Sequence, residues 1–108
     1  MFDINVLNVV HIDDPTYIKY LWWYDIRKDT FGGSELNKTI RRHGDIVEGH
    51  EPGHVSGRVI EFHDDIYVII YSKGYRAVRE DIVSRVIENL QDKFLIKYVI
   101  DESGKIIF

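Results

Sequence analysis

Residues 55–72 read VSGRVIEFHDDIYVIIYS and are the most informative stretch of the chain. Two runs rich in Val, Ile, Phe and Tyr, at 55–62 and 66–72, have the composition of β-strands. Only the tripeptide 63–65 separates the two runs, and a connection of this length joins antiparallel neighbours. The stretch therefore predicts a β-hairpin.

The residues after this hairpin predict one helix and a final pair of short strands. Residues 75–91 repeat apolar side chains at the spacing of one helix face, and Glu80 and Asp81 suit its positively polarised N-terminal end. The apolar positions of that face are Val78, Ile82, Val83, Val86, Ile87 and Leu90. Residues 94–100 then predict a strand, and 105–108 return as a short edge strand after a turn.

The residues before the hairpin begin with a predicted strand and a predicted helix. Residues 2–12 have the Ile- and Val-rich composition of a strand, and Pro15 fits the first position of a helix. We expect this first main helix to span 15–28, because apolar side chains recur there on one face: Tyr17, Tyr20, Leu21 and Tyr24. The double glycine at Gly32 and Gly33 ends it.

A short helix and a mobile segment complete the expected elements. Ser34 provides a capping hydroxyl for a short helix over 35–43, and Gly44 ends that helix. Six of the eight glycines lie between positions 32 and 57, so we expect the segment 29–54 to be mobile.

Together these elements predict one α+β domain that spans residues 1–108. The order β-α-β-β-α-β is the ferredoxin-like split pattern. Right-handed crossovers then place the two main helices on one face of a four-stranded antiparallel sheet. The short extra helix and the C-terminal edge hairpin are additions to this arrangement.

Composition and charge exclude several classes of protein. The chain has no cysteine, which excludes disulfides and thiolate metal sites and fits a reducing compartment. No apolar run approaches the ~20 residues that span a bilayer, and residues 1–5 lack the basic region of a signal peptide. We therefore expect a cytoplasmic protein without membrane contact. The net charge of −4 disfavours, without excluding, non-specific binding to nucleic acid.

Both faces of the predicted sheet are apolar. In the second strand of the hairpin, Tyr67 and Ile69 alternate with Val68 and Ile70, whereas a solvated face carries polar residues. Because a large bare apolar face is uncommon on a soluble monomer, we expect a homodimer whose second copy covers one face. Packing of the 29–54 segment and the C-terminal hairpin on that face is the alternative.

Aromatic side chains outside the apolar helix face are the main candidates for binding a protein partner. Trp23 points away from that face and lies between Lys19 and Arg27, which suits a protein hot spot or base stacking. The alternative is that the short helix or the mobile segment packs over its indole. Tyr67 and Tyr71, on the bare sheet face, are candidates for the same partner contact, for stacking on RNA bases, or for a dimer interface.

A basic cluster is the candidate for contact with an anion or a nucleic acid. A double glycine and a serine precede the predicted short helix, whose basic residues are Lys38, Arg41 and Arg42. The sequence matches neither the Walker A pattern nor the dinucleotide-binding glycine pattern. A solvated basic helix face is the alternative interpretation.

A histidine-rich stretch is the candidate for a divalent metal site. The motif H-E-x-x-H occurs at 50–54, but its central proline and glycine are incompatible with the helix that a zinc protease needs. A looser site would combine imidazole and carboxylate ligands: His50, Glu51, His54, His63 and Asp64. Solvated loop histidines and a turn rich in aspartate explain the same residues without a metal.

No catalytic set is evident, because the chain lacks both cysteine and a G-x-S-x-G nucleophile motif. We therefore expect a small non-enzymatic interaction or regulatory protein, without a cofactor, that docks on a larger macromolecule as a subunit, inhibitor or accessory factor. One alternative is a metal-dependent hydrolase or nuclease that uses the histidine and carboxylate cluster. The other is a nucleic-acid-binding protein that uses the basic aromatic helix face.

Overall fold

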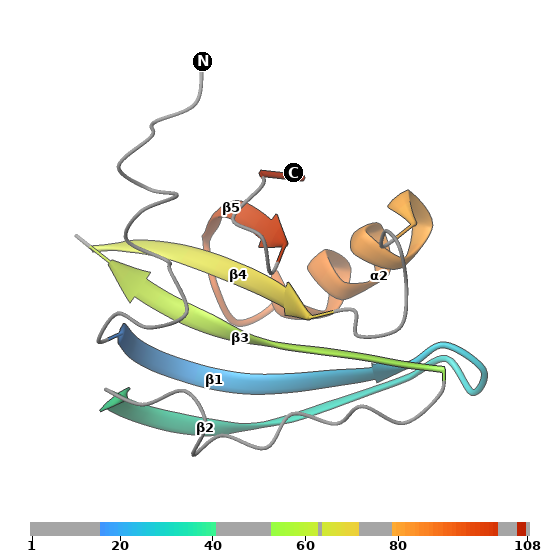
Figure 1. Ribbon diagram of the computed structural model, residues 1–108, viewed down its shortest axis with the longest axis horizontal. Coiled ribbons are helices and arrows are strands. Elements are labelled where there is room, and N and C mark those ends of the chain that lie inside the picture. Colours follow the sequence, from blue (N-terminus) through green and yellow to red (C-terminus); the bar gives the residue numbers. More distant parts are fainter. Residues whose placement is uncertain (1–15, 41–52, 63, 72–78, 102–105, 108) are drawn as a thin grey trace.

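One five-stranded sheet and one helix form the part of the chain that the structure describes (Figure 1). The computed structural model describes residues 16–40, 53–62, 64–71, 79–101 and 106–107. Its elements are β1 (Thr16–Asp25), β2 (Thr30–Ile40), β3 (His54–Phe62), β4 (Asp65–Tyr71), α2 (Glu80–Leu90) and β5 (Ile96–Asp101).

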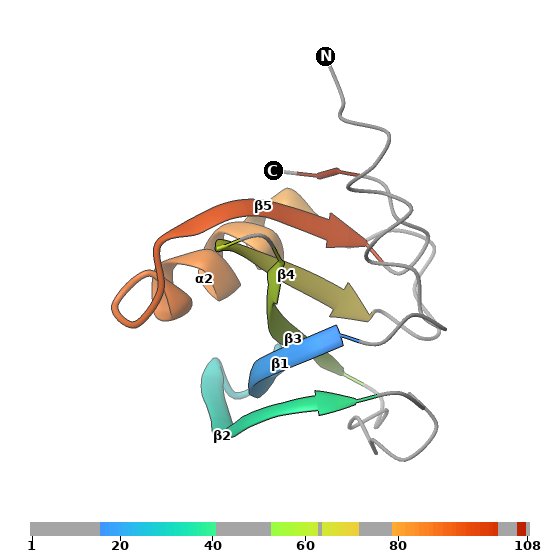
Figure 2. The ribbon, with the colours of Figure 1, turned by 90° about the vertical axis from the view of Figure 1, so that its left-hand side faces the viewer.

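The strands lie in the order β2-β1-β3-β4-β5, so β1, β3 and β4 are interior strands. The pairs β2–β1, β1–β3 and β3–β4 are antiparallel, and β5 is parallel to β4. A parallel neighbour requires a crossover, and α2 supplies it. The helix lies on one side of the curved sheet (Figure 2).

The predicted ferredoxin-like α+β fold is wrong, because the segment expected to form the first main helix is a strand. Residues 16–25 form β1, and residues 30–40, expected to be a mobile segment and a short helix, form β2. Nearly every position from 17 to 24 is apolar, so helical spacing and strand alternation are both satisfied there. Aromatic residues favour the pleated sheet, where they pack against cross-strand neighbours, and this preference decides the outcome.

The elements predicted in the second half of the chain are found. The hairpin is β3 and β4, the helix expected over 75–91 is present as α2, and the strand expected over 94–100 is β5. In the predicted edge strand, Ile106 forms an isolated antiparallel bridge with Ile100. The strand predicted over 2–12 lies outside the described residues.

Aromatic rings from β1 lie over glycines of the two strands beside it. The three pairs are Trp23 over Gly32 and Tyr20 over Gly33, both on β2, and Trp22 over Gly57 on β3. A Cβ atom at position 57 would lie 2.6 Å from Cζ2 of Trp22, and closer still to the backbone carbonyl of Ile69. Each glycine therefore provides the space that a ring of the neighbouring strand occupies.

The helix face of the sheet carries the larger hydrophobic core. Its sheet side comprises alternate residues of the strands, and α2 adds Ile82, Val83, Val86, Ile87 and Leu90. Trp22 is 2% exposed and stacks on Phe31, with the ring centroids 6.0 Å apart. Within the described residues, the indole N–H of Trp22 has no hydrogen-bond acceptor. Such an orphaned buried donor costs about 1–3 kcal/mol, which the burial of the ring offsets.

A second hydrophobic core lies on the opposite face of the sheet, and a β-bulge in β1 adds Ile18 to it. The pairing of β1 shifts between Ile18 and Tyr20, so one extra residue sends these side chains to opposite faces. The second core contains Ile18, Ile60, Tyr67, Ile69 and Ile100, all buried. The expectation that both faces are apolar is therefore confirmed.

Burial of the second core bears on the predicted homodimer. The five buried residues of that core are at most 5% exposed within a single chain. A second copy is therefore not needed to remove these side chains from water. The prediction of a homodimer assumes an uncovered apolar face, and these five residues do not form one. The homodimer itself stays a prediction.

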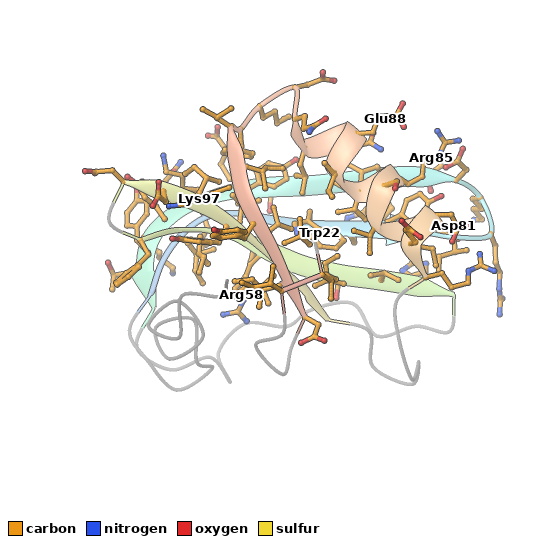
Figure 3. The ribbon with its side chains drawn as sticks, turned by 90° about the horizontal axis from the view of Figure 1, so that it is seen from above. Trp22, Arg58, Asp81, Arg85, Glu88 and Lys97 are labelled. Atoms are coloured by element: carbon orange, nitrogen blue, oxygen red, sulfur yellow. The ribbon has the colours of Figure 1, made fainter. Side chains whose placement is uncertain are left out.

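A polar network fixes the turn between β1 and β2 against α2. The Tyr24 hydroxyl donates to Oδ1 of Asp29 at 2.7 Å, and the Arg85 guanidinium lies 3.0 Å from Oδ2 of the same residue. The hydrogen bond to Asp29, with burial, raises the pKa of Tyr24 above its ordinary value. Arg85, which projects from α2 with Asp81 and Glu88 (Figure 3), thus joins the helix to residues 56 positions away in the sequence.

The packing at Gly57 predicts a large loss of stability on adding one methyl group. We expect Gly57→Ala to lower the free energy of unfolding by about 3 kcal/mol, because the new Cβ meets the Trp22 ring and a backbone carbonyl. Urea denaturation measures the change. Ser34→Ala, at an exposed strand position, is the control and should stay within about 0.5 kcal/mol of the parent. Equal stability of the two variants would contradict this account.

Candidate functional site

The candidate site is an exposed tryptophan near the end of β1 that leads into the turn to β2, together with the residues that surround it. Trp23 pairs in register with Gly32 of β2 and Ser56 of β3, so its side chain stands on an interior strand. The residue is nevertheless 41% exposed. We call the surface formed by Trp23, Asp25, Arg27, Lys28 and His54 the Trp23 platform.

The indole of Trp23 is fixed from two sides. It lies over Gly32, where a Cβ atom would be 2.5 Å from Cε2 of the ring. It also stacks on the imidazole of His54, with centroids 6.2 Å apart and an interplanar angle of 15°. Contacts on two sides restrict the rotamer of the side chain, so the exposed ring is held in one orientation.

Asp25 fixes the imidazole beneath the ring. Nε2 of His54 lies 3.2 Å from Oδ2 of Asp25, and the two residues are direct cross-strand partners. The other carboxylate oxygen accepts the backbone N–H groups of Lys28 and Arg27, at 3.1 Å and 2.9 Å. The Lys28 amide, then the Arg27 amide and His54, hold the pKa of Asp25 below its ordinary value. The carboxylate is therefore ionised at neutral pH.

Two cations form one border of the platform. Arg27 and Lys28 are exposed in the turn after β1. The side chain of Arg27 lies against Gly53, where a Cβ atom would be 2.9 Å from Nε of the arginine. The φ of 85° at position 53 also favours glycine. Within the described residues, neither side chain forms an ion pair. The turn thus presents positive charge beside an apolar ring.

This geometry suits binding better than nucleophilic catalysis. Ser56 lies two residues from His54 on β3 and on the same face, so a serine, a histidine and an aspartate are neighbours. Ser56 is only 1% exposed, however, and a substrate cannot reach its hydroxyl. The accessible groups are an aromatic face and two cations, which can stack and form ion pairs.

The structure separates Lys19 and Tyr67 from Trp23. Lys19 forms an ion pair with Glu61 at 3.1 Å, and Tyr67 is 2% exposed within the second core. Tyr71 ends β4 opposite Ser56, which itself pairs with Trp23, so the register places Tyr71 in the same cross-strand row as Trp23. Lys38 is exposed on β2 rather than on a helix, while Arg41 and Arg42 lie outside the described residues.

The predicted metal ligands are only partly described, so the metal site stays a prediction. His50, Glu51 and His63 lie outside the described residues, and His54 is engaged with Asp25. Asp64 is exposed, with a φ of 65°. The described part of the chain contains no group of three histidine or carboxylate side chains that could hold a metal ion.

A second polar cluster joins the beginnings of β4 and β5. Nζ of Lys97 lies 2.9 Å from Oδ2 of Asp65, and the Tyr67 hydroxyl donates to the same oxygen at 3.4 Å. Burial, followed by the charge of Asp65, raises the pKa of Tyr67, and Asp65 raises the pKa of Lys97. Tyr67 also stacks on Tyr98 at 6.0 Å. The groups of this polar cluster bind one another, which indicates a structural role for the cluster.

Sequence reasoning identified Trp23 and Arg27 but missed the part played by Asp25. The sequence predicts a helix over 15–28, and a helix gives no reason to connect Asp25 with His54, which lies 29 positions away. Register between two strands brings them together, and a strand assignment for residues 16–25 was the only signal that could have revealed the pair.

No family model matches the chain, and no curated protein or solved structure matches it. Among the described residues, α2 is too short and too polar to cross a membrane.

The environment of Asp25 predicts a pH dependence of stability. A carboxylate whose pKa is lower in the folded chain stabilises it above the ordinary aspartate pKa of about 4, and this contribution is lost as the pH falls through the lowered value. We expect Asp25→Asn to be less stable than the parent at pH 7 and to lose less stability on acidification. Urea denaturation at a series of pH values measures both effects.

Asp64→Asn is the matched control for this experiment. Asparagine tolerates the positive φ of that position, and we expect the variant to follow the pH profile of the parent. If Asp25→Asn and Asp64→Asn gave the same profile as the parent, the stabilising role of the Asp25 carboxylate would be refuted.

Proposed function

We propose that the chain is a small non-enzymatic interaction or regulatory module that docks on a larger protein through the Trp23 platform. The observation that carries the proposal is the indole of Trp23, which is 41% exposed yet held against Gly32 and His54. A cytoplasmic location, which the absence of cysteine favours, is part of the proposal.

A fixed aromatic ring is well suited to provide binding energy. Tryptophan dominates the energetics of many protein interfaces, because it buries a large area with few rotatable bonds. Most side chains lose conformational freedom when they bind, which weakens the complex. The ring of Trp23 has already lost that freedom, since two neighbours restrict it in the free chain.

The surrounding charges support orientation of the partner. Arg27 and Lys28 lie at the border of the platform, whereas Asp25 is engaged by His54 and two backbone amides. A ring surrounded by charged residues resembles the arrangement of a hot spot with a polar rim. Cations in that rim would accelerate encounter with an acidic partner.

Single-stranded nucleic acid is the second candidate partner, because a base can stack on an exposed indole while its phosphates approach Arg27 and Lys28. The overall charge of −4 favours a protein instead. Titration with a fluorescent oligonucleotide at low and high salt separates the two. Salt-dependent binding that requires Trp23 would assign the platform to nucleic acid.

We predict that Trp23→Ala abolishes capture of the partner while the fold survives. Loss of the ring over Gly32 should cost about 1 kcal/mol of stability, whereas an interface hot spot contributes at least 2 kcal/mol, or roughly thirtyfold in affinity. Quantitative affinity capture from cells that produce the chain measures the loss, and thermal unfolding checks the fold.

Tyr17→Ala provides the matched control for this variant. Tyr17 is 38% exposed on the same strand but lies at its opposite end. A protein captured by the parent and by Tyr17→Ala, and lost with Trp23→Ala, supports the proposal. The same captured proteins for all three chains would overturn it.

A further inference from the structure

We infer that the partner supplies an extended acidic segment, which pairs as an added strand with the outer edge of β2 over Thr30–Glu35 and places an apolar side chain against Trp23. This inference rests on the proposed function and names the chemistry of its partner. It is carried by three features of β2: its position in the sheet, the rings that lie over it, and the charges at its two ends.

The first half of β2 is an edge of the sheet that the described residues form. Within the described residues β2 pairs only with β1, and alternate residues of an edge strand direct their N–H and C=O groups outward. Pairing with β1 is regular from Thr30 to Glu35, and Gly33, Ser34 and Glu35 are exposed. This stretch has the regular strand pairing beside which a peptide can form a new ladder.

The second half of β2 is unsuited to the same pairing. The register with β1 shifts after Glu35, and Asn37 has a φ of 52°. Such irregularities bend a strand and are a common protection of sheet edges. The binding segment is therefore limited to about six residues of β2.

Aromatic rings reach this edge on both faces of the sheet. Trp23 lies over Gly32 on one face, and Tyr20 lies over Gly33 on the other. Because Gly32 has no side chain, an added strand about 4.8 Å away would contact the exposed indole of Trp23, whereas the ring of Tyr20 is buried against Phe94. An apolar side chain opposite Gly32 would cover the exposed part of the indole.

The charges around β2 select an acidic segment. The nearby carboxylates are already bound: Asp25 by His54 and Asp29 by Arg85. In β2 and the turn before it, the cations that form no ion pair with a described residue are Arg27, Lys28 and Lys38, against the single carboxylate of Glu35. Acidic side chains at the ends of the added strand would compensate this excess of positive charge.

The same charges argue against a second copy of the chain as the occupant. Antiparallel pairing of β2 with itself would bring two sets of these cations together, and like charges on neighbouring strands are destabilising. Nucleic acid fits less well, because its backbone cannot form the N–H and C=O ladder of an added strand. A foreign peptide satisfies both the ladder and the charge.

The probe is a random heptapeptide library displayed on phage, selected against the purified full chain. We expect selected peptides to alternate β-forming residues with Asp or Glu, and to slow amide exchange of Thr30–Glu35 by tenfold or more when they bind. Two N-methylated versions of such a peptide are compared, one methylated at the odd-numbered residues and one at the even-numbered residues. Only one of these two phases should reduce affinity at least tenfold, because half of the amides face β2. Loss in both phases or in neither would contradict strand addition.

Charge reversal at the edge tests the acidic character separately. Lys28→Glu should weaken binding of the selected peptides about three- to tenfold at low salt. Ser84→Glu, on the exposed side of α2, introduces negative charge away from β2 and should leave the affinity unchanged. Equal effects of the two variants would refute charge selection at β2.

The outcomes distinguish this inference from the proposed function. Enriched peptides that are basic, or that protect residues other than β2, overturn the inference, while the Trp23→Ala capture experiment still decides the proposed function. A dimer in native mass spectrometry, with Thr30–Glu35 protected in the absence of peptide, would assign the edge to a second copy and overturn the inference as well. Failure to enrich any peptide would do the same.

Discussion

The placement of aromatic rings over glycines is the constraint on which the rest of the structure depends. The rings of Tyr20 and Trp22 enter the core on one face of β1, and that of Trp23 lies on the other face. The neighbouring strands can approach β1 because they have no side chain where the rings lie. The interior strand therefore determines both what the helix packs against and what the opposite face presents at the surface.

The platform and the core share this strand, which explains how an exposed ring can be rigid. A ring on a loop would move with the loop, whereas Trp23 stands on a strand that is paired on both sides. The turn that follows is attached to α2 through Asp29 and Arg85, so Asp25, Arg27 and Lys28 are positioned by the helix as well. Core packing and surface geometry are thus set by the same contacts.

The sequence predicted the second half of the chain well and the first half poorly, for a physical reason. In α2 the apolar residues recur with the 3.6-residue period of a helix, and β3 and β4 are rich in β-branched residues. Local preference and fold therefore agree in this half of the chain. In residues 17–24 nearly all positions are apolar, which satisfies both periods. Gly32 and Gly33 then resemble helix breakers, although their role is to lie beneath rings of β1. The basic neighbours of Trp23 in the sequence indicate a binding residue. Its stacking on His54, and the contact of His54 with Asp25, depend on strand register, which a single sequence does not encode locally.

The contact between Trp23 and Gly32 also has an evolutionary consequence. The indole occupies the volume that a side chain at position 32 would need, so neither residue can change freely while the other is kept. Replacement of the tryptophan by a small residue would release position 32 for larger side chains, and a larger residue at 32 would displace the ring. In descendants of this sequence the two positions should vary together, and a surface that loses its tryptophan should also lose its glycine.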